Sequence, residues 1–373
     1  MMYKRKPYSL VIVIVVIYLV YLFVSTIRYP QHQTATEHQS SKLKTAVDTE
    51  KNTNFLKQGS GLHPTLKLKL EDEATVRQQL SFQYPYDSKK PFPKRVWQTW
   101  KVKLEDEHFP ANYKRFHQQW VNLNPDYYVN VVSDDECSEL VKTLYRGVPD
   151  VARAYNIMPK SILKADFFRY LILFARGGVY SDIDTQGLKP VNDWLSMNKT
   201  IYGDVNKVGL VVGIEADPDR PDWAEWYARR IQFCQWTMQS KVGHPMLREL
   251  IANITDQTLL REKNHQLKKV LGKDEGGDIM NWTGPGIWTD KVFEYMNNVM
   301  QQPDNFKTRK YDDIITWKIF TGTSKAIVVS DVLVLPITSF SPGVGQMGAG
   351  HISHPMAYSQ HMFLGSWKPE LER

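Results

Sequence analysis

The sequence predicts an α/β domain built on a parallel sheet and carried behind an N-terminal membrane-spanning helix. Strand-like and helical stretches alternate from about residue 93, an order typical of parallel sheets with nucleotide-binding topology. An uncharged apolar run at residues 8–27 predicts the membrane segment. The 373 residues, 42% hydrophobic and 23% charged, are enough for one large globular domain or two ordinary ones.

The N-terminal run has the length of a membrane span. At 1.5 Å rise per residue, a helix over residues 8–27 is about 30 Å long, the hydrocarbon thickness of a bilayer. A cleaved signal peptide is the alternative, but its apolar core is normally about 7–15 residues long, and only a weak cleavage site is present around Ser25. Residues 4–6 are basic, which predicts a cytoplasmic tail over residues 1–7. We therefore expect a single-pass type II membrane protein whose remaining residues are lumenal.

Residues 28–92 are predicted to form a lumenal stem. They are rich in Gln, Ser, Thr and Lys and lack sustained hydrophobic periodicity, apart from a short helix that we expect near residues 66–80. Residues 93–373 form the predicted catalytic domain. The net charge of +7 comes from scattered Lys and Arg, without a basic helix or an RNA-binding signature. This pattern argues against nucleic-acid binding and is compatible with an enzyme whose ligands are phosphates.

The domain opens with alternating elements. Val, Trp and Thr predict a strand in "RVWQTW", and the sequence "NPDYYVNVV" combines a turn with an alternating strand. Helical periodicity marks a long helix in "SILKADFFRYLILFARGG", which Gly177 should close as a C-cap. The expected elements, in order, are a strand at 95–100, a helix at 113–123, a strand at 127–132, helices at 138–145 and 161–176, a strand ending at residues 182–184, and later strands within "VGLVVGIEA" and "VLVLPITSF".

The two cysteines, Cys137 and Cys234, would face an oxidising compartment if the domain is lumenal. One disulfide and two buried free thiols are both compatible with the sequence.

Two pairs of charged residues are candidates for chemistry. Asp182 and Asp184 would point to the same side of a strand, where they repel each other unless a cation neutralises them. Oxygen ligands of this kind suit Mg²⁺ or Mn²⁺, whereas a solvated turn is the alternative interpretation. Asp166 and Arg169 are three residues apart and share a helix face, where an exposed ion pair is the alternative.

The segment "KADFFRYLILFARGGVYSDIDT" resembles the core signature of glycosyltransferases of the GT-A fold. More narrowly, the chain is similar to the family of yeast initiation-specific α-1,6-mannosyltransferases and related glycosyltransferases with a DXD signature. The likeness includes "PKRVWQTWK", "GIEADPDRPDW", "TGPGIWT", "VLPITSFSPGVGQMGA" and "HMFLGSWK", in that order. It implies a Rossmann-like mixed sheet flanked by helices behind a signal anchor.

The resemblance implies a metal site. Asp182 and Asp184 would hold a divalent ion, Mn²⁺ with Mg²⁺ as the alternative, against the diphosphate of the donor GDP-mannose. Asp184 is the favoured direct ligand, and His361 would approach the metal or the diphosphate from the C-terminal end. Each of these roles competes with the ordinary use of such residues on a surface or in a core.

The resemblance also implies a donor site. Asp166 and Arg169 would face the donor sugar and, with the two aspartates of the metal site, form the catalytic group. Trp97 would stack on the nucleotide base, with core packing as its alternative. Trp367 and Lys368 would help to close the site.

Two further segments carry weaker expectations. Glu215, Asp217 and Asp219 belong to a loop that suits either acceptor hydroxyls or plain solvation. Residues 283–286 form a Gly/Pro turn that would shape the sugar pocket.

The function implied by the resemblance is addition of α-1,6-linked mannose from GDP-mannose to a high-mannose N-linked glycan in the Golgi, with retention of anomeric configuration. Two alternatives stay open at this stage: an inositol-phosphoceramide mannosyltransferase, and a largely structural subunit of a Golgi mannan-synthesising complex. A complex with other mannosyltransferases is compatible with either enzyme. No nucleic-acid partner is expected.

Overall fold

The computed structural model describes residues 74–198, 207–270, 278–300 and 314–364. The predicted cytoplasmic tail, the membrane span at 8–27 and most of the predicted stem lie outside these ranges. Within them, no helix combines the length and the apolar character that crossing a membrane requires. The signal anchor therefore stays a prediction.

The helices and strands occur in a mixed order along the chain. The α-helices are α3 (Val76–Gln83), α4 (Ala111–Leu123), α5 (Asp134–Leu144), α6 (Pro149–Ile157), α7 (Ser161–Arg176), α9 (Pro245–Lys263), α10 (Asp278–Trp282) and α11 (Pro285–Met300). The strands are β1 (Arg95–Trp100), β2 (Tyr128–Ser133), β3 (Gly178–Ser181), β4 (Thr185–Gly187), β5 (Leu210–Ala216), β6 (Gln232–Phe233), β7 (Thr237–Ser240), β8 (Ile327–Val329), β9 (Val332–Leu335) and β10 (Ser359–His361). The predictions of β1, α4, β2, α5 and α7 are confirmed, with bounds that differ by a few residues.

An eight-stranded mixed sheet forms the centre, with the order β2-β1-β3-β7-β5-β9-β8 and β6 beside β5. The predicted parallel pairing is confirmed for β2, β1 and β3 and for β5 with β9. It is wrong for β7, which runs antiparallel to both of its neighbours. The cause is the connection before it, because residues 217–231 contain a short 3-10 turn and no crossover helix, so the chain returns antiparallel.

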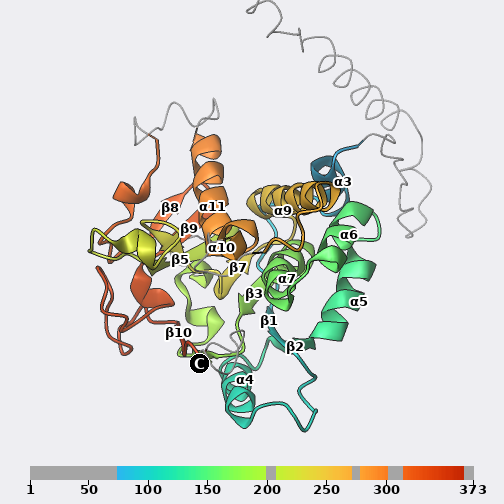
Figure 1. The fold of residues 1–373 in the computed structure, drawn as a ribbon. Coiled ribbons are helices and arrows are strands. Elements are labelled where there is room, and N and C mark those ends of the chain that lie inside the picture. The colour runs from blue at the N-terminus through green and yellow to red at the C-terminus, as the bar shows by residue number, and fades with distance from the viewer. Residues whose placement is uncertain (1–73, 199–206, 271–277, 301–313, 365–373) are drawn as a thin grey trace, which may run out of the picture. The chain divides into compact units, whose positions relative to one another are not determined.

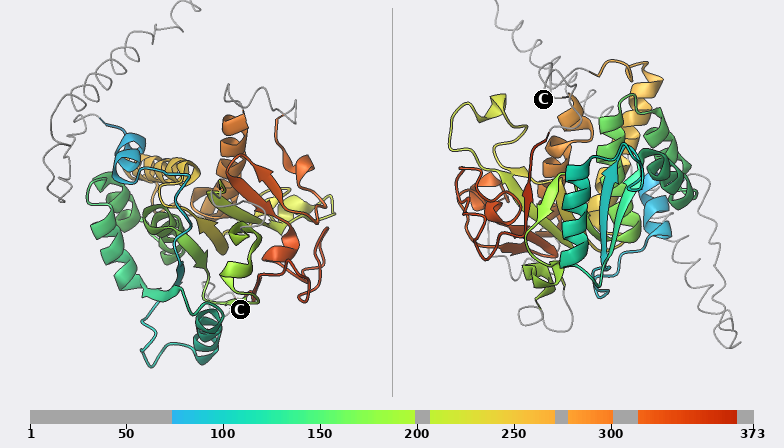
Figure 2. Two further views of the ribbon diagram at one scale, coloured as in Figure 1. Left: turned by 180° about the vertical axis from the view of Figure 1, so that it is seen from behind. Right: turned by 90° about the horizontal axis from the view of Figure 1, so that it is seen from below.

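Hydrophobic layers cover both faces of this sheet. Helices α5, α6, α7 and α9 lie together on one side of the strands, and α4 lies on the other (Figure 1, Figure 2). Side chains alternate along the strands accordingly: Val212 joins the core under the larger helical layer, whereas Val211 joins the core that contains Trp120 of α4. The sheet is thus buried on both faces, and ligand access is left to its ends.

Two glycines link α7 to β3. Gly177 adopts a left-handed φ of 63° and its amide donates to the Leu173 carbonyl at 2.8 Å, which confirms the predicted C-cap. Gly178 has φ of 98°, and a Cβ at this position would lie 2.5 Å from the Arg95 carbonyl oxygen. The absence of a side chain therefore allows β3 to begin directly beside β1.

Both cysteines are buried free thiols. Cys137 lies in the core under the larger helical layer and Cys234 lies in the opposite core. The structure therefore supports the interpretation of two buried free thiols and not that of a disulfide.

Part of the range predicted as stem packs on the domain. The compact unit extends over Leu70–Arg373, and α3 lies against α9 through an ion pair of 2.7 Å between Arg77 and Glu249. Further along, the Tyr86 hydroxyl donates to Asp331 at 2.7 Å. Residues just before β1 thus contribute contacts to the folded unit.

Asp331 is the centre of a polar cluster that yields a test of stability. It accepts hydrogen bonds from Tyr86 at 2.7 Å and Tyr295 at 3.0 Å, and His244 Nε2 lies 3.2 Å away. Burial opposes ionisation of Asp331, but the hydrogen bond and charge of His244 and the two hydroxyls outweigh it and lower the pKa below 3.8.

We expect Asp331→Asn to destabilise the protein by about 2 kcal/mol at pH 7, since a carboxylate that accepts from two hydroxyls and lies beside His244 is lost. Because the folded pKa lies below the unfolded value, the wild type holds this stability above about pH 4 and loses it as the pH falls through the folded pKa. Urea denaturation at several pH values should show the difference shrinking below pH 4. Asp193→Asn, at an exposed position, serves as the control. A difference that stays constant with pH would contradict the assigned charge.

Candidate active site

The two aspartates lie in a tight turn between β3 and β4. The Asp182 amide donates to the Trp236 carbonyl at 2.8 Å, and both the amide and the hydroxyl of Thr185 donate back to the Asp182 carbonyl, at 3.0 and 2.6 Å. The expectation that Asp182 and Asp184 share a face by strand alternation is therefore wrong. The turn, rather than an extended strand, brings the two carboxylates to the same place.

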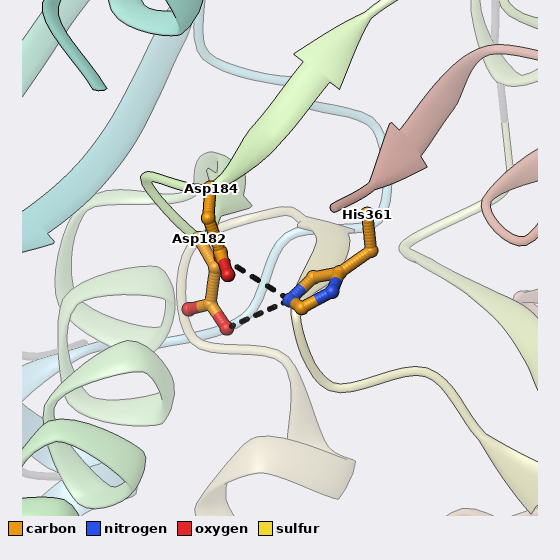
Figure 3. A group of neighbouring side chains, drawn as sticks. All are labelled: Asp182, Asp184 and His361. Atoms are coloured by element: carbon orange, nitrogen blue, oxygen red, sulfur yellow. Dashed lines mark ion pairs between the residues drawn. The ribbon is translucent and has the colours of Figure 1, made fainter. Parts of the chain in front are cut away.

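His361 reaches these carboxylates from the C-terminal end of the chain. Strand β10 pairs with β4, with His361 opposite Thr185, and the Met362 amide donates to the Asp184 carbonyl at 2.9 Å. The imidazole Nε2 lies 3.2 Å from Asp184 Oδ1 and 4.0 Å from Asp182 Oδ2 (Figure 3). Its Nδ1 accepts from the Phe363 amide at 2.9 Å, so a neutral ring carries its proton on Nε2 and donates it toward the carboxylates.

Asp182, Asp184 and His361 fit a divalent cation. One ligand atom from each lies within 4.8 Å of the others. Burial raises the pKa of Asp182, whereas for Asp184 the opposing hydrogen bond and charge of His361 outweigh burial and lower the pKa. Two adjacent carboxylates suit Mn²⁺ or Mg²⁺. His361 could become a third ligand only through a deprotonated Nε2. A neutral ring would then carry its proton on Nδ1, which could no longer accept the hydrogen bond from the Phe363 amide.

Asp166 and Arg169 form a buried ion pair on α7. Their side chains are 3% and 6% exposed and 3.0 Å apart, so the alternative of an exposed surface pair is excluded. Asp166 also accepts from Gln235 and from Thr283, each at 3.1 Å. Burial raises the pKa of Asp166 to about 6 although Arg169 opposes the shift. Arg169 lies 3.6 Å from Asp182 as well, which joins the ion pair to the aspartate turn.

These groups line one cavity with a volume of about 670 Å³. It opens at the carboxyl ends of β1, β3 and β5, which run parallel to one another, the usual place for ligands in α/β sheets. Its lining also includes Thr99, Trp100, Lys101, Asp134, Glu215, Trp226, Tyr227, Gln232, Met280 and Pro285. A cavity of this size and polarity suits a nucleotide-sized ligand together with part of a second substrate.

Comparison with known proteins supplies the family. A family model described as "glycosyltransferase sugar-binding region containing DXD motif" matches residues 110–201, which include α7 and both aspartates. An initiation-specific alpha-1,6-mannosyltransferase of Candida albicans is 62% identical over 365 residues, covering 96% of this chain and 95% of that protein. A protein of the same name from Saccharomyces cerevisiae is 40% identical, covering 83% and 85% of the two chains. The chain belongs to the initiation-specific α-1,6-mannosyltransferase family.

A second type of mannosyltransferase shares much less of the chain. Inositol phosphoceramide mannosyltransferase 3 of Schizosaccharomyces pombe is 33% identical over 92 residues, which are 25% of this chain and 24% of that protein. Likeness to the initiation-specific α-1,6-mannosyltransferases, by contrast, extends over nearly the whole chain.

Trp97, which the resemblance places at the nucleotide base, lies away from the cavity in this protein. Trp97 is buried in the core, and its indole nitrogen donates to the Gly177 carbonyl at 2.9 Å. It is not among the described residues that line the cavity, because it sits inside β1, whereas Thr99 and Trp100 occupy the strand end that meets the cavity. Trp367 and Lys368 lie outside the described residues.

The three acidic residues at the end of β5 and just after it have three different environments. Glu215 lines the cavity, and burial raises its pKa to about 7. Asp217 is buried and holds Arg230 at 2.7 Å and the Gly322 amide at 2.6 Å, so it stabilises the loop. Asp219 lies at a separate pocket. In the sequence, Glu215 is marked by its position as a polar residue close to the end of an apolar strand.

The Gly/Pro turn at residues 283–286 borders the site as expected. Thr283 holds Asp166, and Gly284 and Pro285 line the cavity.

Proposed function

We propose that this protein is a retaining glycosyltransferase of the GT-A type that transfers mannose from GDP-mannose through an α-1,6 linkage to the core of a high-mannose N-linked glycan. Family membership supports the reaction. The observation that carries the proposal is the buried chain of charges from Asp166 through Arg169 to the aspartate turn, aimed into a nucleotide-sized cavity. We further propose a Golgi membrane location, with the domain lumenal.

The aspartate turn provides the site for the leaving group. A divalent cation held by Asp182 and Asp184 would offset the charge that develops on the diphosphate. The Tyr180 hydroxyl donates to Asp182 Oδ1 at 2.8 Å and fixes that carboxylate with its other oxygen toward Asp184 and His361. His361 can donate its Nε2 proton to Asp184 or to a phosphate oxygen at the same position.

The donor sugar would lie in the cavity between the aspartate turn and Glu215, which both line it. Asp166 retains acceptor capacity on Oδ2 beyond its bond to Thr283, so it can accept a bond from a sugar hydroxyl. Among the described residues, Glu215 Oε2 has no hydrogen-bond partner, which makes it available to orient the attacking hydroxyl.

The donor and the product are both α-linked, so configuration is retained. In the route that we propose, the bond from C1 to the phosphate oxygen breaks, the bond from C1 to the acceptor oxygen forms on the same face, and the acceptor proton passes to the departing phosphate. A double displacement through a carboxylate is the alternative.

Incubation of the purified full-length protein with GDP-mannose, Mn²⁺ and a high-mannose N-glycan tests the proposal. We expect a single added mannose, identified as α-1,6-linked by NMR of the product. Absence of transfer to the glycan would reject the proposed function.

Inositol phosphoceramide should be offered in parallel. The narrow match to the lipid-acting relative predicts that the glycan is the better acceptor. Preferential labelling of the lipid would reverse this assignment, and a protein without activity toward either acceptor would fit a structural subunit.

A further inference from the structure

A second pocket lies outside the cavity that contains the aspartate turn. Its volume is about 380 Å³, and it is formed by the loop that follows β5 together with the short 3-10 helix η6 (Trp317–Ile319). The residues that line it are Asp219, Arg220, Pro221, Trp223, Arg230 and Trp317. The reaction proposed above uses none of them.

Each of the two arginines of this pocket is paired with an aspartate. Arg220 is paired with Asp222, and Arg230 is paired with the buried Asp217 at 2.7 Å. The guanidinium groups therefore do not add up to a free positive site of the kind that binds phosphate. Donor N–H groups, the Asp219 carboxylate and indole rings instead suit a neutral ligand with many hydroxyl groups.

Exposed tryptophans add flat apolar surface to these polar groups. Trp317 is 37% exposed, with the Arg230 guanidinium 4.8 Å from its ring centre. Such rings combine an apolar face with a polar edge, which matches the alternating C–H and hydroxyl surfaces of a pyranose. The pairing with arginine also holds the ring in place, so binding would cost little side-chain entropy.

The pocket and the active-site cavity adjoin each other at Arg220 and Trp226. Trp226 is 53% exposed and lines that cavity, and the guanidinium of Arg220, which lines the second pocket, lies 5.2 Å from the Trp226 ring centre. A ligand that enters the cavity on the Glu215 side could therefore extend over Trp226 into the second pocket.

We propose that this pocket is a remote subsite for a neutral oligosaccharide, binding sugar residues of the acceptor that lie away from the reacting hydroxyl. The inference rests on the proposed function, because it takes the acceptor to be a branched glycan. It adds that acceptor size is sensed at Trp317 and its neighbours, outside the cavity where transfer occurs.

The test compares a large and a small acceptor in Trp317→Ala. We expect the Kd for a high-mannose glycan, measured by calorimetry without donor, to rise about fivefold to tenfold. The ratio of KM for the glycan to KM for methyl α-mannoside should rise by the same factor. Trp317→Phe keeps an aromatic ring and should retain most of the affinity. Tyr128→Ala removes an aromatic residue that is 69% exposed on β2, at the opposite edge of the sheet, and should leave the ratio unchanged.

The two readouts separate the two proposals. Unchanged glycan affinity in Trp317→Ala would overturn the subsite, as would an equal loss for both acceptors. Absence of transfer by the wild type would instead reject the proposed function. The comparison of glycan Kd between the wild type and Trp317→Ala would still show whether the pocket binds the glycan. A phosphorylated glycan that bound much more tightly than the neutral one would contradict the assigned ligand class.

Discussion

Replacement of Asp184 by alanine should lower mannose transfer by about 1,000-fold or more while the domain stays folded. The carboxylate lies at the meeting point of the aspartate turn and β10, where it faces His361 at 3.2 Å. Its removal would delete one of the two oxygen ligands of the proposed cation site, and the diphosphate charge would then lack its main counterion. Loss of one charge-stabilising group in a preorganised site commonly costs about 100- to 1,000-fold, and loss of the cation costs more.

Cation binding gives a readout independent of turnover. Titration with Mn²⁺, followed by electron paramagnetic resonance, should give a much weaker Kd for Asp184→Ala and for Asp184→Asn, which preserves side-chain size. Asp193→Ala, an exposed aspartate in the segment that follows β4, should leave Mn²⁺ affinity and transfer unchanged. Full activity in Asp184→Ala would contradict the assignment of the metal site. Loss of the cooperative thermal unfolding transition in this variant would show that the carboxylate is chiefly structural.

The elements that were predictable from the sequence are those determined by local pattern. Helix α7 carries its apolar residues at helical spacing and ends at a glycine with positive φ, so both its existence and its end could be predicted. The direction of β7 could not, because it depends on strands that are distant in the sequence and on a connection without a helix. Local periodicity contains no information on which strands become neighbours.

The identities of the site residues were predictable where these residues belong to motifs shared with the family. The resemblance brought Asp166, Arg169, Asp182, Asp184 and His361 together, and the structure places them around one cavity. The conformation of the aspartate turn was not predictable, since it is fixed by the Trp236 carbonyl and by pairing with β10, both remote in the sequence.

Burial decides between the alternatives that the sequence left open. Trp97 occurs in a motif shared with the family, but the sequence does not reveal that its indole is enclosed between α7 and the sheet. For Glu215 the sequence left open whether the side chain meets acceptor hydroxyls or solvent, and the structure places it next to the last residue of β5, a strand whose other residues are buried. Whether a polar side chain at a strand end faces a cavity or water depends on packing against distant segments.

We expect Glu215→Gln to lower kcat by about 100-fold and to stabilise the protein at the same time. The carboxyl group faces the cavity, and its Oε2 atom has no partner among the described residues, so its ionised form is poorly compensated. If it orients the attacking hydroxyl by accepting a hydrogen bond from it, a neutral amide of equal size keeps the shape but loses the charge that polarises that hydroxyl, an effect of about 100-fold. A residue that only packed would show no such loss in kcat.

The effect on stability has a defined sign. Burial raises the pKa of Glu215 from 4.5 to about 7, so between these pH values the folded state retains a proton that the unfolded state releases. The free energy of unfolding of the wild type therefore falls as the pH rises through this window, whereas glutamine is neutral throughout. Urea denaturation should show Glu215→Gln close to the wild type near pH 4.5 and about 3 kcal/mol more stable at pH 7.5.

A gain in stability that accompanies a loss in rate would distinguish a functional carboxyl group from a structural one, because a group retained for packing or hydrogen bonding is stabilising when present. Glu139→Gln, which changes an exposed glutamate on α5, should alter neither quantity. A less stable Glu215→Gln with unchanged kcat would contradict the proposed role and return the residue to the structural class of its neighbour Asp217, whose carboxylate is fully engaged by Arg230 and the Gly322 amide.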